Sequence, residues 1–349
     1  MSEKKEPTTE EILGKLSYLT REDMPEARWT VGGALRYDRS LQAIARFLSS
    51  FLGVRTVSTV QAEVPCLWSL DWFVQRRPMP QDDYVAALEH YAHAGIGVTL
   101  VFDNPYLREE DLNDSYGLHL VRELHKHDRV RLNAVSVASD ALAARLRAEW
   151  PKLPLHAHVN RVVVEKGKRT PAFYNKLAGQ YARVCLHPAD AVKPAVFSGI
   201  AEPARFDVVM NDPCLRTCPV RREHLQLLAA MRREPYKVDT MVRRSELLER
   251  AGCHKVDAAA LRQKATNNLS RAEAHALYAA GFRSFVIQSQ QFRNEATRLW
   301  DVFQCMFDGA NPLLSNKAAL IASSCMAELR PQPEAPASGL GAFSFTNYE

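Results

Sequence analysis

The chain has 349 residues, of which 46% are hydrophobic, so it contains enough apolar material to bury a large core. Its 45 basic and 40 acidic residues leave a formal net charge of +5. The one candidate basic cluster, Arg216–Arg233, is explained by a solvated helix face, so nucleic acid is not an expected partner. The apolar runs are too short to span a membrane and the polar start lacks a signal-peptide core, so we expect a cytoplasmic protein.

Short β-branched runs alternate with amphipathic stretches along the chain. The predicted strands are Thr30–Leu35, Val54–Val60, Gly97–Phe102, Val130–Val137, Leu155–Val159, Arg183–Leu186, Phe206–Met210 and Phe282–Ile287. The predicted helices are Ser40–Leu52, Gln81–Ala94, Glu109–Lys126, Asp140–Trp150, Pro171–Tyr181, Ala189–Gly199, Pro219–Arg233 and Asn294–Phe307. Asp140 is the expected N-cap of its helix, and Gly95 the expected end of the helix before it.

Eight strand–helix cycles are typical of a parallel sheet closed by crossover helices. The α/β class therefore follows, and eight cycles favour a (β/α)8 barrel over an open doubly wound sheet. We expect a polar leader with one short helix over residues 1–28, a barrel over 29–308 and a C-terminal extension over 309–349, flexible from about 330. Residues 234–281 exceed an ordinary loop, so they form a predicted insertion before the last strand, folded over the barrel mouth.

Polar side chains follow the predicted strands as a set. They are Arg36, Asp38, Gln61, Glu63, Asp103, Asn104, Ser136, His158, Asn160, His187, Asn211, Asp212, Gln288 and Ser289. In a barrel, the loops after the strands converge on one face, where active sites lie. We therefore expect a polar pocket over the barrel mouth.

The seven cysteines are an odd number spread unevenly along the chain, which indicates a reducing compartment rather than a disulfide framework. Three of them lie in apolar segments and are expected to be buried: Cys185, Cys305 and Cys325. The other four lie in predicted loops on the functional face: Cys66, Cys214, Cys218 and Cys253.

Cys214 and Cys218 follow the seventh strand four positions apart. Thiolates that converge from separate loops suit a 4Fe–4S cluster, so we predict one on the four loop cysteines. Zinc is the alternative, held by the same set or by three cysteines with His224 or His254. A radical-SAM motif needs a third cysteine where this chain has Arg221, which excludes that motif.

The stretch N-D-P-C-L-R-T-C-P-V-R-R-E-H, residues 211–224, resembles a motif of the collagenase-like U-type peptidases, a family that includes proteins of ubiquinone and tRNA hydroxylation. It is most similar to uncharacterised bacterial barrel proteins in which the seventh strand ends N-x-x-C-x3-C-P-x-R-x-x-H. The G-G-x-L-R at Gly32–Arg36 and the stretch ending at Asn104-Pro105 also fit that group. The resemblance covers roughly Trp29–Phe307, although its specific motif is about fourteen residues long.

The resemblance implies a (β/α)8-like barrel with a cluster on four cysteines, in a family associated with oxygen-independent hydroxylation or with a peptidase label. The family's cysteine pair ahead of the C-x3-C is not visible here, because Cys185 lies within a strand. Cys253 in the insertion and Cys66 must then supply the remaining ligands. No nucleophile elbow, H-E-x-x-H or other hydrolytic constellation supports peptidase chemistry.

The leading hypothesis is a metal-dependent enzyme that modifies a small or peptide-like substrate by redox or hydroxylation chemistry. The candidate proton-handling residues are His158, His187 and His224, because imidazole titrates near neutrality. The remaining candidates are Asp38 and Asp103 as catalytic carboxylates, Arg36 and Arg221 for an anionic substrate group, and Asn104, Asn160 and Asn211 for substrate binding.

Two alternatives stay open. One is a zinc-dependent hydrolase or lyase on the same barrel, with Asp38, Glu63 or Asp103 as the general base beside a metal-bound water. The other is a non-catalytic accessory protein that uses its metal structurally and works through a protein partner.

Overall fold

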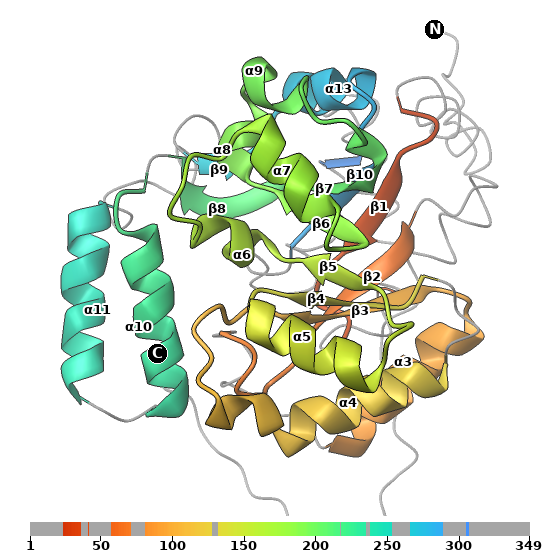
Figure 1. Ribbon diagram of the computed structural model, residues 1–349, viewed down its shortest axis with the longest axis vertical. Coiled ribbons are helices and arrows are strands. Elements are labelled where there is room, and N and C mark those ends of the chain that lie inside the picture. The colour runs from red at the N-terminus through yellow and green to blue at the C-terminus, as the bar shows by residue number, and fades with distance from the viewer. Residues whose placement is uncertain are drawn as a thin grey trace, which may run out of the picture.

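The computed structural model describes residues 24–35, 41, 57–70, 81–127, 132–216, 218–234, 238–252, 266–288 and 305–306. Within these residues, eight parallel strands close into a barrel in the order β1-β10-β7-β6-β5-β4-β3-β2 (Figure 1). The strands are β1 (Arg28–Val31), β2 (Val57–Glu63), β3 (Gly97–Phe102), β4 (Ala134–Val137), β5 (Leu155–Ala157), β6 (Arg183–Leu186), β7 (Phe206–Val209) and β10 (Ser284–Ile287). The predicted (β/α)8 barrel is confirmed. Six of the predicted strands contain the observed one, whereas the predictions Thr30–Leu35 and Val54–Val60 only overlap β1 and β2.

Helices surround this barrel. The α-helices are α3 (Gln81–His93), α4 (Ser115–Lys126), α5 (Asp140–Glu149), α6 (Val159–Val163), α7 (Pro171–Ala178), α8 (Pro188–Ala191), α9 (Pro194–Phe197), α10 (Arg221–Arg233), α11 (Val238–Ala251) and α13 (Arg271–Ala279). Two short 3-10 helices accompany them, η2 (Glu110–Asn113) and η3 (Pro203–Arg205). No helix of the described part of the chain is long and apolar enough to cross a membrane.

The main hydrophobic core lies between the barrel wall and the helices. Alternate residues of a strand point to opposite faces, so Trp29 and Val60 join this core while their neighbours Thr30 and Thr59 line the barrel interior. The outward positions are apolar on strand after strand, as in Val98, Phe206 and Phe285. Burial of this outer face therefore supplies most of the hydrophobic stabilisation.

Several predicted boundaries are wrong. The predicted strand Leu155–Val159 ends at Ala157, and Val159 begins α6, whose sequence V-N-R-V-V reads as a strand because valine is β-branched. The cap of α5 is Ser139, whose side chain accepts from the backbone N–H of Leu142, and not Asp140. The predicted helix Glu109–Lys126 is divided into η2 and α4, because Asp114 caps α4 by accepting from the backbone N–H groups of Tyr116 and Gly117.

The predicted helix Ala189–Gly199 is likewise divided, because Pro194 begins a new turn, α9, after α8. The predicted end of α3 is confirmed within one residue, and Gly95 adopts a φ of 64°. The predicted helices over 40–52 and 294–307 lie almost wholly outside the described residues. The same holds for the leader and for the extension from residue 309.

The segment after β7 forms a strand and not the predicted loop. β8 (Asn211–Leu215) pairs antiparallel with β9 (Thr266–Asn268), with Asp212 opposite Asn267. The predicted insertion thus returns to the Cys214 segment after forming α11. Figure 1 shows α10 and α11 side by side at one edge of the barrel, and Leu227 of α10 packs with Leu247 of α11.

Gly117 gives a test of the packing between α4 and the loop after β2. A Cβ on Gly117 would lie 2.5 Å from Cε3 of Trp68, a fully buried ring that is fixed by its Nε1–H donating to the carbonyl of Asp111. We expect Gly117→Ala to lower the free energy of unfolding by about 1–3 kcal/mol, despite the higher helix propensity of alanine. Chemical denaturation would measure the loss.

Gly167→Ala is the matched control, because its Cβ would come only to 3.7 Å from the flexible side chain of Glu165. We expect that variant to stay within about 0.5 kcal/mol of the wild type. Equal effects of the two substitutions would contradict the packing described for Trp68.

Candidate functional site

Three neighbouring strands end in polar residues that the sequence singled out. His158 follows β5, His187 follows β6, and Asn211 and Asp212 follow β7. Because β5, β6 and β7 are adjacent in the barrel, these residues lie along one arc of its C-terminal face. The predicted polar mouth is therefore present on this arc.

His158 and His187 each begin a short helix as its N-cap. Nδ1 of His158 accepts from the backbone N–H of Asn160 at 3.2 Å, and Nδ1 of His187 accepts from that of Ala189 at 3.1 Å. An accepting Nδ1 carries no proton, so the neutral ring carries its proton on Nε2. Both rings thus present an Nε2–H donor, and neither Nε2 has a hydrogen-bond partner among the described residues.

Burial keeps both imidazoles neutral. Together with the positive charge of Arg221, it lowers the pKa of His158 to about 4 and that of His187 to about 3. A neutral ring whose Nδ1 accepts the capping bond has no lone pair left on Nε2 for a metal. In this tautomer the two imidazoles are hydrogen-bond donors, and their predicted role in proton handling stays a prediction.

A buried ion pair holds Arg221, the first residue of α10. Its Nη2 donates to Oδ2 of Asp212 at 2.7 Å. Asp212 is 3% exposed and also accepts from the backbone N–H of Cys214 and from the amide of Asn267. Burial lowers the pKa of Arg221, but Asp212 and the sulfur of Cys214 outweigh it and raise that pKa overall, so the guanidinium stays charged. Its Nη1 is buried with no hydrogen-bond partner in the described part of the chain.

A pocket of about 540 Å³ opens beside this ion pair. Its lining residues are Val163, Arg169, His187, Leu215, Arg216, Cys218, Pro219, Arg221, Arg222 and Glu223. Arg169 and Arg216 have carboxylate partners, Asp190 and Glu273, whereas Arg222 donates to the carbonyl of Val163. Four arginines against one lining carboxylate make the pocket attractive to an anionic group.

Cys214 and Cys218 lie close to Arg221. Both are partly exposed, both help to raise the pKa of the guanidinium, and Cys218 lines the pocket. Sulfur is a soft donor that suits thiophilic metals, and partial exposure lets a ligand reach both side chains. These two cysteines are therefore placed for chemistry at the pocket.

Cys66 lies elsewhere. Its side chain is part of the main hydrophobic core, and burial, with the charge of Asp114, raises the pKa of its thiol. Its carbonyl accepts from Nε of Arg232, which is eleven positions after Arg221 on α10, or about 16 Å along the helix axis. Cys66 thus occupies the end of α10 remote from Cys214 and Cys218, where it fills space in the core.

The predicted four-cysteine set is not assembled by the described residues. Cys253 lies outside them, and among those described no group of three or more His, Cys, Asp or Glu side chains is arranged to hold a metal ion. Cys214 and Cys218 suit a thiophilic metal, but Cys66 does not join them. A cluster on this pair and Cys253 remains a prediction.

The remaining predicted residues support loops. Oδ1 of Asp103 accepts from the backbone N–H of Leu70, and the amide of Asn160 donates to the carbonyl of Asp103. Asn104 donates to the carbonyl of Leu67 and accepts from the backbone N–H of Tyr106. These bonds fix the loops after β2 and β3.

Asn211 ties β8 to the end of β10, because its amide donates to the carbonyl of Gln288 and accepts from its N–H. His224 lies on α10 with its pKa lowered by burial and by Arg244 and Arg221.

Arg36 and Asp38 lie outside the described residues. The sequence did not identify Asn267, because no motif surrounds it. It identified Asp212 as a residue at a strand end but did not predict that Asp212 pairs with Arg221.

No family model and no curated protein matches this sequence. The chain is similar to a solved structure, that of the U32 peptidase Mk0906, at 14% identity over 75% of this chain and 92% of that one, with a TM-score of 0.47. At this level the likeness carries no argument about activity, and the barrel rests on its own strand order.

The two neutral histidines predict that the free energy of unfolding decreases as the pH is lowered. Their folded pKa values lie below the unfolded value of about 6.5, so the unfolded chain takes up protons first and stability falls as the pH drops from about 6.5 towards 4. Between pH 7.5 and 5.5 we expect each ring to cost about 1.4 kcal/mol of unfolding free energy. Urea denaturation at the two pH values would measure this loss.

His187→Asn is the matched variant, since an Asn side chain caps a helix N-terminus equally well but does not titrate. Between the two pH values, this variant should lose about 1.4 kcal/mol less unfolding free energy than the wild type, which is the contribution expected from one histidine. An unchanged loss, or an Nδ1–H tautomer of His187 in a nitrogen NMR spectrum, would contradict the assignment.

Proposed function

We propose that the protein is a barrel enzyme that acts on a small or peptide-like substrate and binds an anionic or carbonyl oxygen of it at the C-terminal end of β6 and β7. The observation that carries the proposal is the pairing, in one pocket, of a neutral Nε2–H on His187 with the buried, charged guanidinium of Arg221. Both groups can only donate, so the site is complementary to an oxygen that gains negative charge.

Donors fixed before the reaction stabilise charge that develops on an oxygen without having to reorient. Asp212 fixes the orientation of Arg221, and the helix cap fixes the ring of His187. A neutral imidazole at a helix N-terminus that polarises a carbonyl is a known catalytic device. His158 follows β5, and the charge of Arg221 also lowers its pKa, so its Nε2–H would offer a second donor.

Cys214 and Cys218 would supply the reactive centre of this enzyme. With Cys253 they form the core of the predicted 4Fe–4S site, with zinc as the alternative metal. A cluster would provide electron transfer, and zinc would polarise a bound oxygen or water. The protein's own residues would bind the substrate oxygen and hold it beside the thiolates.

The activity is testable without a known substrate. A mixture of short peptides and small organic acids is incubated anaerobically with the protein, and mass spectrometry identifies the compounds that are consumed. We expect Arg221→Lys, which keeps the charge but loses the planar fork, to slow consumption by roughly a hundredfold or more. The matched control is Arg108→Met, because the side chain of Arg108 is 63% exposed and forms its ion pair with the exposed Glu110.

The proposal would be contradicted if the wild type consumed no compound, or if Arg221→Lys and the wild type consumed it at equal rates. A thermal melt of each variant separates loss of function from loss of fold, since lysine can still pair with the buried Asp212.

The metal prediction is tested separately. Iron, zinc and acid-labile sulfide are measured on protein purified anaerobically, for the wild type and for Cys214→Ser, Cys218→Ser and Cys66→Ala. We expect the first two substitutions to remove the metal and Cys66→Ala to retain it, because Cys66 lies in the core at the other end of α10. Loss of metal in Cys66→Ala, with the fold intact, would restore Cys66 as a ligand.

A further inference from the structure

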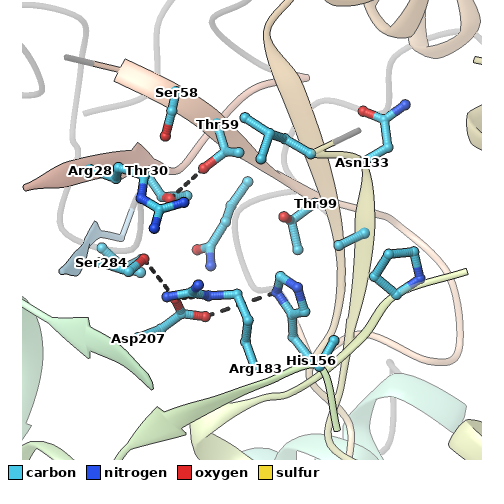
Figure 2. Close-up of a pocket in the computed structure, with 16 residues that line it drawn as sticks. Arg28, Thr30, Ser58, Thr59, Thr99, Asn133, His156, Arg183, Asp207 and Ser284 are labelled. Carbon is cyan, nitrogen blue, oxygen red and sulfur yellow. Dashed lines mark hydrogen bonds and ion pairs between the residues drawn. The ribbon is translucent and has the colours of Figure 1, made fainter. Parts of the chain in front are cut away.

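A second cavity, of about 220 Å³, lies inside the barrel at the N-terminal ends of the strands (Figure 2). It is lined by Arg28, Thr30, Ser58, Thr59, Gln61, Thr99, Leu132, Asn133, Ala134, Pro154, His156, Ala182, Arg183, Asp207, Ser284 and Val286. Barrel interiors are usually packed with bulky branched side chains. This one is lined mainly by polar groups.

Asp207 is the centre of the polar lining. Its Oδ1 accepts from Nε of Arg183 at 2.8 Å and from Oγ of Ser284 at 2.7 Å, and Figure 2 shows the carboxylate between Ser284 and His156. Its Oδ2 lies 3.9 Å from Nδ1 of His156, too far for a hydrogen bond. Burial lowers the pKa of His156 to about 4, so this ring is neutral and does not form an ion pair.

Several lining groups have no partner in the described part of the chain. Thr99 is 4% exposed, and neither its hydroxyl nor the side-chain amide of Gln61 forms a hydrogen bond there. Arg28, at the mouth, has no carboxylate within reach among the described residues. These groups line the cavity with hydrogen-bonding capacity that a polar occupant could use.

The charges and size of the cavity define that occupant. The lining carries two arginines, Arg28 and Arg183, and one carboxylate, Asp207, which leaves an excess of one positive charge. The volume corresponds to roughly seven waters at liquid density. We propose that this cavity is a second ligand site, which binds a small hydroxylated anion with its charged group at Arg28 and its hydroxyls at Gln61 and Thr99.

The second site is separate from the pocket at the C-terminal face. Inward-facing side chains Cys185, Val209 and Val286 pack together in the middle of the barrel, with Leu225 of α10 packed onto the same cluster. This apolar layer lies between the two polar ends. The inference therefore does not depend on the function proposed above.

Binding is tested with glycerol phosphate and L-malate as probes and glycerol as the uncharged control, by thermal shift and calorimetric titration on the full chain. We expect both anions, and not glycerol, to raise the melting temperature. Arg28→Met should weaken the affinity about tenfold, because a charge-assisted contact is lost. The isosteric Thr99→Val should weaken it roughly threefold to tenfold, as for one neutral hydrogen bond.

Arg108→Met, on the surface, is the control and should bind as the wild type does. No shift with either anion, an equal shift with glycerol, or unchanged affinity in Arg28→Met would overturn the proposal. Loss of binding in Arg221→Lys would do the same, because it would place the anion in the C-terminal pocket.

Discussion

The ion pair between Asp212 and Arg221 is the interaction on which the functional face depends. It joins the strand that follows β7 to the first turn of α10, and through Asn267 it also holds β9 of the insertion. Both groups are largely withdrawn from water, so loss of either partner leaves an uncompensated charge that costs about 3–5 kcal/mol. The positions of Cys214 and Cys218 follow from it, because Cys214 lies in β8 and Cys218 lies between β8 and α10.

The same guanidinium shapes the electrostatics of its neighbours. It disfavours protonation of His158 and His187, which burial has already made unfavourable. Two short helices then use the unprotonated Nδ1 atoms as caps, and this leaves the Nε2–H groups as donors. Helix capping, burial and one fixed charge thus leave the Nε2–H groups of these rings as the donors for a ligand, while the Nδ1 atoms accept from the backbone.

The barrel interior is divided by polarity along its axis. Polar residues line both ends, and an apolar layer of Cys185, Val209 and Val286 separates them. Stability comes mainly from the outer face of the strands, where large apolar residues meet the helices. Because the inner face contributes less to that core, it can hold polar groups at two places without loss of the fold.

The sequence by itself determined the barrel, since alternation of β-branched runs and amphipathic stretches is a local pattern that repeats eight times. It also located His158 and His187, because polar residues stand where strands end. Only the tertiary structure decided their chemistry: a helix cap fixed the tautomers, and a strand from the insertion placed Asn267 on Asp212. Cys66 and Cys214 look alike in sequence, yet one is buried in the core and the other lies near Arg221, because burial depends on contacts between residues far apart in the chain.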